Sequence, residues 1–370
     1  MNFKKTAIAL AVAGIATAPI AAQAGVADIY ASVRIGLWNV EQGDDGGTSS
    51  TIGSTSELDV RSFSSRFGVK AETDMGNGMT GFGRYEWDVD FNNDNGEDDI
   101  GIRQRFVGVK GDFGKILLGQ TYHTYYSFVV GPTDIPWWHA GYSMVAYRGR
   151  TDNAITYTGG GGNFNFGVSA YFSVDATAAT PAVAATPSVG GPAPGAPITD
   201  LGSVAVAAAP EGGEETIDQL EVGVSFGIGG TTLGLGVITA ESGSIGNGVV
   251  DSSGDPEPVL GISWSGISLG PTTLGFVYEM QDDDTGLTVE LDVGNAYFRM
   301  ESETLDGLAI DGDGLRGGVD QDRLGITLGY TQNLGKDTLI YYEVYTLDND
   351  TGNSDDDLAA VMAVLKFNIL

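Results

Sequence analysis

The chain has 370 residues and a formal net charge of −31, with 18 lysine and arginine residues against 49 aspartate and glutamate residues. Such a charge argues against nucleic-acid binding, because a polyanion repels phosphate. The absence of cysteine excludes disulfide bonds and thiolate metal sites, and 57 glycines favour a turn-rich all-β protein.

The first 24 residues are predicted to be a cleaved secretory signal peptide. A basic start with Lys4 and Lys5 is followed by an apolar run over 7–22, and residues 22–24 (AQA) have the small-x-small form that signal peptidase cleaves. Cleavage leaves residues 25–370, with 16 basic and 49 acidic residues and a net charge of −33. No later run approaches the ~20 apolar residues of a transmembrane helix.

Alternating apolar and polar residues then predict strands with one dry and one wet face. In 29–37 the odd-numbered residues are apolar, in 63–72 Phe63 and Ser65 begin one face, and the pattern returns in 79–91. Both a membrane-spanning barrel and a secreted β-sandwich present such strands, and the β-sandwich is the structural alternative.

The connections between these strands favour the barrel. Short glycine-rich turns alternate with longer acidic connections, as in a meander with tight turns at one rim and long loops at the other. The turns lie at 74–78, 111–114, 159–163 and 333–337, and the long connections at 41–56, 92–98, 241–257, 304–320 and 348–356. We therefore predict one all-β domain over 25–370, a transmembrane antiparallel up-and-down β-barrel of about 16 strands.

One segment offers no face to bury. Residues 176–210 consist almost entirely of Ala, Pro, Thr, Val and Gly, with Asp200 as the one charged residue. We predict a flexible insert in an outer loop, with surface recognition as the alternative.

Three segments carry a resemblance to a known family. They are SRFGVK at 65–70 with DMGNG at 74–78, RQRFVGVKGDFG at 103–114 with LGQ at 118–120, and RTDNAITY at 150–157. In their order and spacing, over residues 25 to 172, they resemble the trimeric general diffusion porins of Gram-negative outer membranes. The chain departs from that family at its end, where Phe367 stands three residues before the terminal Leu370 instead of at the terminus.

The resemblance implies that residues 122–149 fold back into the barrel as a constriction loop. Irregular backbone is tolerated at membrane depth only where protein or water surrounds it. Trp137 and Trp138 are then expected to wedge the loop against the wall, with loop packing alone or a sugar-stacking platform as the alternatives. Asp134 is the only carboxylate of this loop, and the family often places more there.

Opposite the loop, inward-facing arginines are predicted to form a basic wall. Arginine stays charged at any working pH, and rings of fixed charge set the selectivity of narrow pores. The predicted wall contains Arg34, Arg66, Arg84, Arg103, Arg105, Arg148 and Arg150. Asp134, Glu86 and Asp88 are predicted as the facing carboxylates. For any single arginine, neutralising a nearby lumen acid is the alternative role.

These features predict a passive diffusion channel for small hydrophilic solutes and ions, with a mild cation preference arising from the acidic loops. The alternatives are a sugar- or peptide-specific channel, and a barrel enzyme or adhesin. An enzyme is not predicted, because neither His123 nor His139 has a nucleophile or carboxylate cluster nearby in sequence. No cofactor or metal is expected; the Asp311–Gly314 segment lacks the bidentate acid of a calcium loop. The resemblance implies a homotrimer in outer-membrane lipid and lipopolysaccharide.

Overall fold

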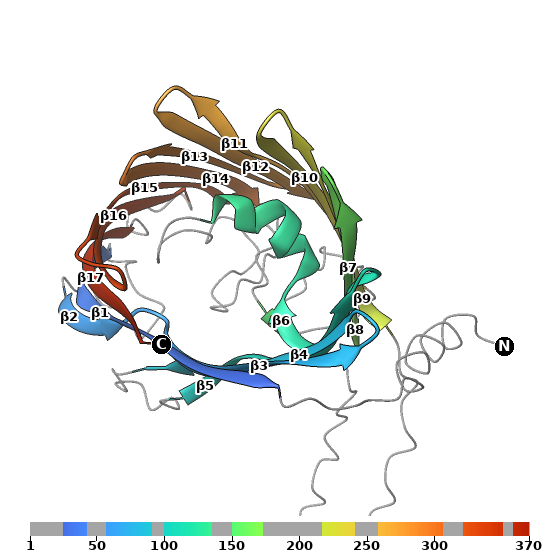
Figure 1. Ribbon diagram of the computed structural model, residues 1–370. Helices are drawn as coiled ribbons and strands as arrows, with labels where there is room; N and C mark the ends of the chain where they lie inside the picture. Colours follow the sequence, from blue (N-terminus) through green and yellow to red (C-terminus); the bar gives the residue numbers. More distant parts are fainter. Residues whose placement is uncertain are drawn as a thin grey trace, which may run out of the picture.

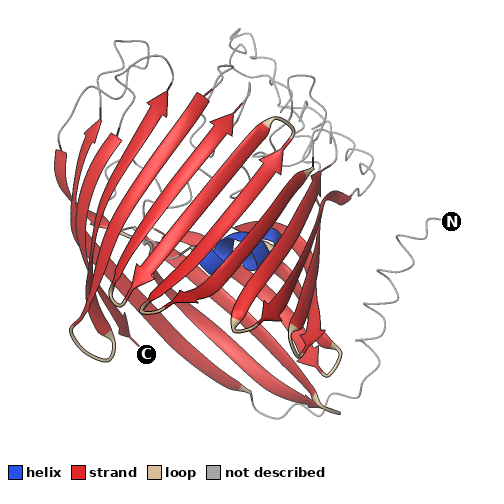
Figure 2. Ribbon diagram, turned by 90° about the horizontal axis from the view of Figure 1, so that it is seen from above, coloured by secondary structure: helices blue, strands red, loops and turns tan. Residues whose placement is uncertain are grey.

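A computed structural model describes residues 25–42, 57–90, 100–134, 150–172, 217–240, 258–305, 321–350 and 358–369. These residues form one sheet that curves round on itself, with a short helical segment inside it (Figures 1 and 2). The strands are β1 (Val26–Gln42), β2 (Glu57–Ser62), β3 (Ser65–Gly76), β4 (Met79–Val89), β5 (Ile100–Gly111), β6 (Gly114–Tyr122), β7 (Arg150–Gly161), β8 (Phe164–Phe172), β9 (Ile217–Ile228), β10 (Thr231–Ala240), β11 (Val259–Leu269), β12 (Thr272–Gln281), β13 (Asp284–Val293), β14 (Ala296–Leu305), β15 (Gln321–Asn333), β16 (Thr338–Asp350) and β17 (Leu358–Ile369).

The sheet is closed. Apart from β2 and β3, each strand pairs antiparallel with its chain neighbour, and β17 returns to pair with β1 from Ala31↔Ile369 to Gln42↔Leu358. The segments β2 and β3 both pair with the other edge of β1 and so form one span, interrupted at residues 63–64. The prediction of an all-β transmembrane barrel of about 16 strands is therefore confirmed. A closed sheet leaves no edge with unpaired backbone groups, which is the condition for crossing lipid.

The alternation of short and long connections is also confirmed. Turns of two residues join β3 to β4, β5 to β6, β7 to β8 and β9 to β10 at one rim. At the other rim, the two-residue turn Asp282–Asp283 joins β12 to β13, where the predicted alternation of short and long connections would place a longer one. The predicted signal peptide (1–24) and insert (176–210) lie outside the described residues.

The two faces of the wall have the predicted polarity. On β1, Ile29 and Leu37 are exposed on the outside of the barrel, whereas Ser32 and Arg34 are buried on the inside. Exposed large apolar side chains recur on the outer faces of most of the strands. In a membrane barrel this outer surface meets the hydrocarbon.

The prediction for the start of the 63–72 strand is wrong. Ser64 adopts a left-handed conformation (φ 57°), which breaks the alternation between β2 and β3. As a result Phe63 is buried against Trp38 inside the barrel, with their ring centroids 5.9 Å apart. Ser65 fills the gap in the ladder: its hydroxyl donates to the Arg34 carbonyl oxygen at 3.0 Å and accepts from the Arg34 N–H at 2.9 Å.

Within the described residues, no helix is both long and apolar enough to cross a membrane.

The opposite directions of neighbouring side chains on β17 give a direct test of the two faces. We expect Leu365→Lys, which places a charge on the outer face, to lower the free energy of unfolding in lipid vesicles by about 2–4 kcal/mol if the residue lies near the bilayer centre. The matched variant Lys366→Gln changes the lumen face and should shift that free energy by less than about 0.5 kcal/mol. Denaturant titration measures the free energy of unfolding of both variants. An equal decrease in the two variants would contradict the assignment of the outer and inner faces.

Candidate functional site

The helical segment that follows β6 lies inside the barrel rather than outside it (Figures 1 and 2). It consists of η1 (Tyr126–Val130) and η2 (Gly131–Thr133). Its sequence, YSFVVGPT, has no alternation and so cannot extend the sheet. Pro132 supports the second short helix, since its fixed φ suits a first helical turn. We call residues 123–134 the inner loop.

Glycines on the wall let the inner loop lie directly on the sheet. A Cβ on Gly234 would come within 2.0 Å of the Phe128 carbonyl oxygen. A Cβ on Gly261 would come within 2.0 Å of the Tyr125 hydroxyl, and one on Gly236 within 2.6 Å of Val129. Only glycine permits this approach at all three positions. The inner loop therefore packs directly against the backbone of β10 and β11.

Glu221 on β9 holds the start of the inner loop. Its carboxylate pairs with Nδ1 of His123, and its second oxygen accepts from the Tyr125 N–H at 2.9 Å. Gln219 donates to the same carboxylate at 2.6 Å. The His123 ring also stacks on Tyr171, with centroids 4.8 Å apart. Hydrogen bonds to a charged group are the stronger kind, about 1.5–3 kcal/mol each, so this is a firm anchor.

Further polar contacts hold the middle and end of the inner loop. The Tyr125 hydroxyl donates to Glu279 on β12 at 2.8 Å, and Ser263 on β11 donates to the Phe128 carbonyl at 3.2 Å. Burial, and then the nearby Glu279, raise the pKa of the Tyr125 hydroxyl well above its usual value, so it remains a donor. Arg299 on β14 donates to the Thr133 carbonyl at 2.7 Å. The loop is thus attached to four strands of one wall.

Apolar packing fills the space between these anchors. The side chains concerned are buried together beneath the loop: Tyr125, Val129 and Val130 from the loop, and Ile238, Val259 and Val277 from the wall. Because these side chains are buried together and the polar groups beside them are hydrogen-bonded to the wall, the position of the loop is set by the barrel wall and not by the loop alone.

The close contact at Gly234 predicts the effect of adding one methyl group there. In Gly234→Ala the Phe128 carbonyl must move by on the order of 1 Å, because packed atoms do not approach to 2.0 Å. We expect the loop to move into the lumen and the single-channel conductance to fall. The control is Gly227→Ala, whose new Cβ would meet only Asn163 at 3.5 Å. Unchanged conductance in Gly234→Ala would contradict the close packing of the inner loop against Gly234.

Across the lumen from the inner loop, several cations line the inside of β17 and β1–β5. Arg34 stands directly opposite Lys366 in the β1–β17 ladder. Arg84 lies over the Tyr30 ring, 5.7 Å from its centroid. We call this the basic wall, and it consists of Arg34, Arg66, Arg84, Arg103 and Lys366. Because these five cations lie on one part of the inner surface, the potential there is positive.

Glu86 and Asp88 lie within this basic wall and not across from it, contrary to the prediction that they face it as an acidic side. Glu86 accepts from Arg103 Nε at 3.1 Å, from Gln104 at 3.2 Å and from the Tyr30 hydroxyl at 2.8 Å. Asp88 lies 3.6 Å from Arg103 Nη1. Both carboxylates share the inner face of β4 and β5 with the arginines, so they reduce the charge of the wall locally.

Arg105 is on the outside of the barrel, whereas the sequence placed it on the same face as Arg103. The β4–β5 ladder pairs Glu86 with Gln104 but Trp87 with Ile102, so Arg103 is an extra residue in a β-bulge. After the bulge Arg105 stands opposite Tyr85, an outer residue, and is itself exposed. Alternation cannot be carried through a bulge, because two residues there oppose one.

The remaining predicted residues fall near the ends of the inner loop or outside the described part of the chain. Arg150 donates to the Tyr122 hydroxyl at 3.0 Å and lies over its ring. Asp134 accepts from the Tyr126 hydroxyl at 2.5 Å, and burial raises the pKa of its carboxyl. Trp137, Trp138, Arg148, His139 and the 311–314 segment are outside the described residues, so their predicted roles stay predictions.

An acidic wall on the other side of the lumen was not predicted. It lies on β12–β14 and β16, across from β3–β5 (Figure 1), and comprises Glu279, Glu290, Glu301, Glu303 and Glu343. Arg299 is fully buried among them, paired with Glu301 and 3.8 Å from Glu290. The signal was present in the sequence: Arg299, Glu301 and Glu303 occupy alternate positions of one strand.

The arrangement is suited to the passage of solutes. Of the two histidines, the described one, His123, is buried against Glu221 beneath the loop. A basic wall facing an acidic wall produces a transverse field, which orients dipolar solutes and sorts ions as they pass.

Comparison with known proteins agrees with this geometry. A model of the Gram-negative porin family matches residues 6–352. A monosaccharide porin from a Halomonas species is 37% identical over 127 residues, which cover 31% of this chain. The aligned part spans about a third, 32%, of that relative.

Two solved structures have a similar fold. OmpT of Vibrio cholerae in its trimer form aligns with a TM-score of 0.60 at 14% identity, covering 94% of this chain and 100% of that one. An anion-selective porin from Comamonas acidovorans aligns with a TM-score of 0.59 at 17% identity, covering 93% and 100%. At these identities the likeness shows the fold.

Proposed function

The chain belongs to the Gram-negative porin family and forms a channel in the outer membrane, and we propose that this channel passes small hydrophilic solutes and ions by passive diffusion. The observation that carries the proposal is the position of the inner loop: it lies inside the barrel and narrows the lumen, and it is fixed to the wall opposite the basic wall. A passive channel needs no moving part, and a fixed restriction is enough to set its selectivity.

We further propose a mild cation preference at low salt. The chain carries 49 acidic residues against 18 basic ones, and the basic wall accounts for five of the latter. The acidic excess therefore lies elsewhere, and an acidic surround concentrates cations before they reach the restriction. Salt screens this effect within about 10 Å at 0.1 M and about 3 Å at 1 M.

Reversal potentials in a planar bilayer test this preference. We expect a potassium-to-chloride permeability ratio above one at about 0.1 M salt, falling toward one at about 1 M as the surrounding charge is screened. The relative from Comamonas acidovorans is anion-selective, and a ratio below one at low salt would place the selectivity of this channel at its basic wall instead. That outcome would contradict the cation preference and leave passive diffusion intact.

A sugar-specific channel is the second candidate, because the Halomonas relative is a monosaccharide porin. The stacked rings of Tyr122 and Tyr126, 4.9 Å apart at the start of the inner loop, are the described aromatic surface that a sugar could contact. Saturable block of the ion current by one monosaccharide would favour this candidate, whereas block by none would favour general diffusion.

We also propose that the channel is a homotrimer embedded in outer-membrane lipid and lipopolysaccharide. The support is the trimer form of the similar Vibrio protein and the apolar outer surface of the barrel. Three identical pores in one complex should insert together, so conductance should rise in groups of three equal steps. Single isolated steps in every insertion would contradict the trimer.

A further inference from the structure

Contacts from β1, β3 and β5 meet at Glu86, on the inner face of β4. Glu86 stands opposite Gly68 on β3, and Gly68 stands opposite Tyr30 on β1. A Cβ on Gly68 would come within 2.7 Å of the Tyr30 hydroxyl. Because Gly68 has no side chain, Tyr30 can lie across β3 and donate to Glu86 Oε2 at 2.8 Å. The glycine thus allows a residue two strands away to bond to this carboxylate.

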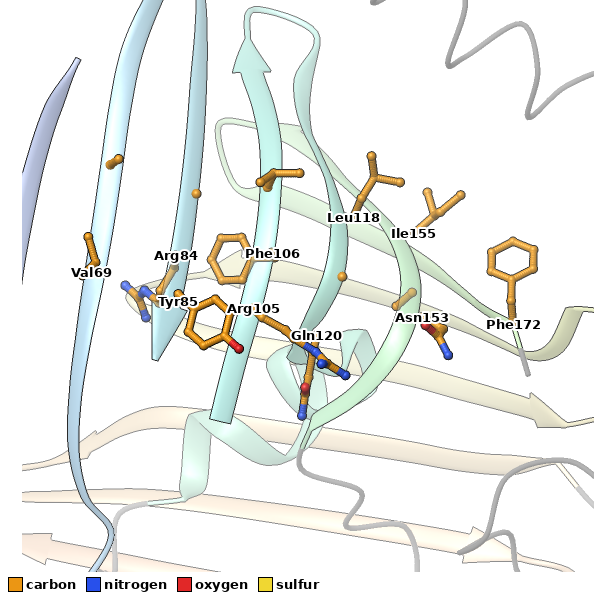
Figure 3. A pocket seen from close by; sticks show the side chains of 15 residues that line it. Val69, Arg84, Tyr85, Arg105, Phe106, Leu118, Gln120, Asn153, Ile155 and Phe172 are labelled. Atoms are coloured by element: carbon orange, nitrogen blue, oxygen red, sulfur yellow. The ribbon is translucent and has the colours of Figure 1, made fainter. Parts of the chain in front are cut away.

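The β-bulge on β5 brings two consecutive side chains to the same carboxylate. Arg103 Nε donates to Glu86 Oε1 at 3.1 Å, and Gln104 donates to the same oxygen at 3.2 Å. In a regular strand these two neighbours would point to opposite faces. Past the bulge, Arg105 lies on the outer face beside Gln120 (Figure 3). The bulge therefore gives the inner face a glutamine that bonds to Glu86 and sends one arginine out of the lumen.

Glu86 is enclosed by these partners. The residue is 3% exposed, and Arg66 Nη1 lies 4.0 Å from its Oε1. A second carboxylate, Asp88, lies 3.6 Å from Arg103 Nη1 and has a side chain that is 42% exposed. Because solutes cannot contact a residue buried in this way, Glu86 can act on the lumen only through its charge and through the arginines that it holds.

We propose that Glu86 is a specificity-determining residue, whose charge, together with that of Asp88, lowers the positive potential of the basic wall and shifts the ion preference of the channel toward cations. The basic wall has five cations, so the two carboxylates offset two of its five charges. The proposal rests on the proposed channel function. It adds to the acidic surround a second source of the ion preference, which lies inside the lumen.

Reversal potentials of matched variants in planar bilayers test the role of Glu86. Glu86→Gln keeps the size of the side chain and removes its charge. At about 0.1 M potassium chloride we expect this variant to lower the potassium-to-chloride permeability ratio about two- to fivefold relative to the wild type, the effect of one unit charge ~8 Å from a permeating ion in water. Glu86→Asp keeps the charge, so we expect its ratio to return to the wild-type value.

Tyr30→Phe is the control for a purely structural role. This variant removes a hydrogen bond from Glu86 and leaves the carboxylate in place, so we expect the permeability ratio of the wild type. An unchanged ratio in Glu86→Gln, or equal shifts in Glu86→Gln and Tyr30→Phe, would overturn the proposal.

Asp88→Asn keeps the proposal testable if Glu86→Gln does not assemble. The side chain of Asp88 is more exposed than that of Glu86, so its replacement disturbs the wall less. A permeability ratio below that of the wild type supports the proposal, and an unchanged ratio overturns it.

Failure of this proposal and failure of the proposed function give different results. Each variant is compared with the wild type, so the sign of the shift is informative whichever ion the wild-type channel prefers. A wild-type channel that conducts, with the same ratio in Glu86→Gln, refutes the role of Glu86 and leaves passive diffusion intact. A wild-type protein without conductance refutes the proposed function itself.

Discussion

The ladder between β1 and β17 is the constraint on which the rest of the structure depends. Twelve residue pairs from Ala31↔Ile369 to Gln42↔Leu358 join the first and last strands. A sheet of this size with free edges would expose unpaired backbone groups to hydrocarbon, which is unfavourable by several kcal/mol for each group. Closure removes the edges, and it also fixes which residues meet lipid and which meet water, because side chains between bulges point alternately to the two sides of a strand.

Closure also creates the surface on which the inner loop rests. Gly234, Gly236 and Gly261 face the lumen on neighbouring strands, so the loop backbone can lie directly on the wall. Glu221 and Arg299 then hold its two ends from strands that are distant in sequence. The restriction in the lumen is therefore a property of the whole barrel: a change in the register of β9–β14 would move glycines and anchors together.

The sequence was sufficient for the fold because period two and the rhythm of turns are local signals, and both survive in β1, β4 and β17. The sequence did not predict the position of a side chain where that position depends on a β-bulge or on a contact between residues far apart in the chain. One bulged residue beside Glu86 sends Arg105 outward while Arg103 stays inside. Glu86 was assigned to an acidic side because its partner Arg103 cannot be identified by counting. His123 and Glu221 are 98 residues apart, and nothing in either segment indicates that they meet.

The most direct test of closure is a disulfide across the β1–β17 ladder. The double variant Val33→Cys with Phe367→Cys joins two residues that stand opposite each other on the outer face, in a chain with no other cysteine. Mild oxidation of the membrane-inserted protein is predicted to give an intramolecular disulfide within each monomer. Disulfides that link separate chains, or no disulfide at all, would show that the first and last strands are open edges, and would contradict the closed barrel.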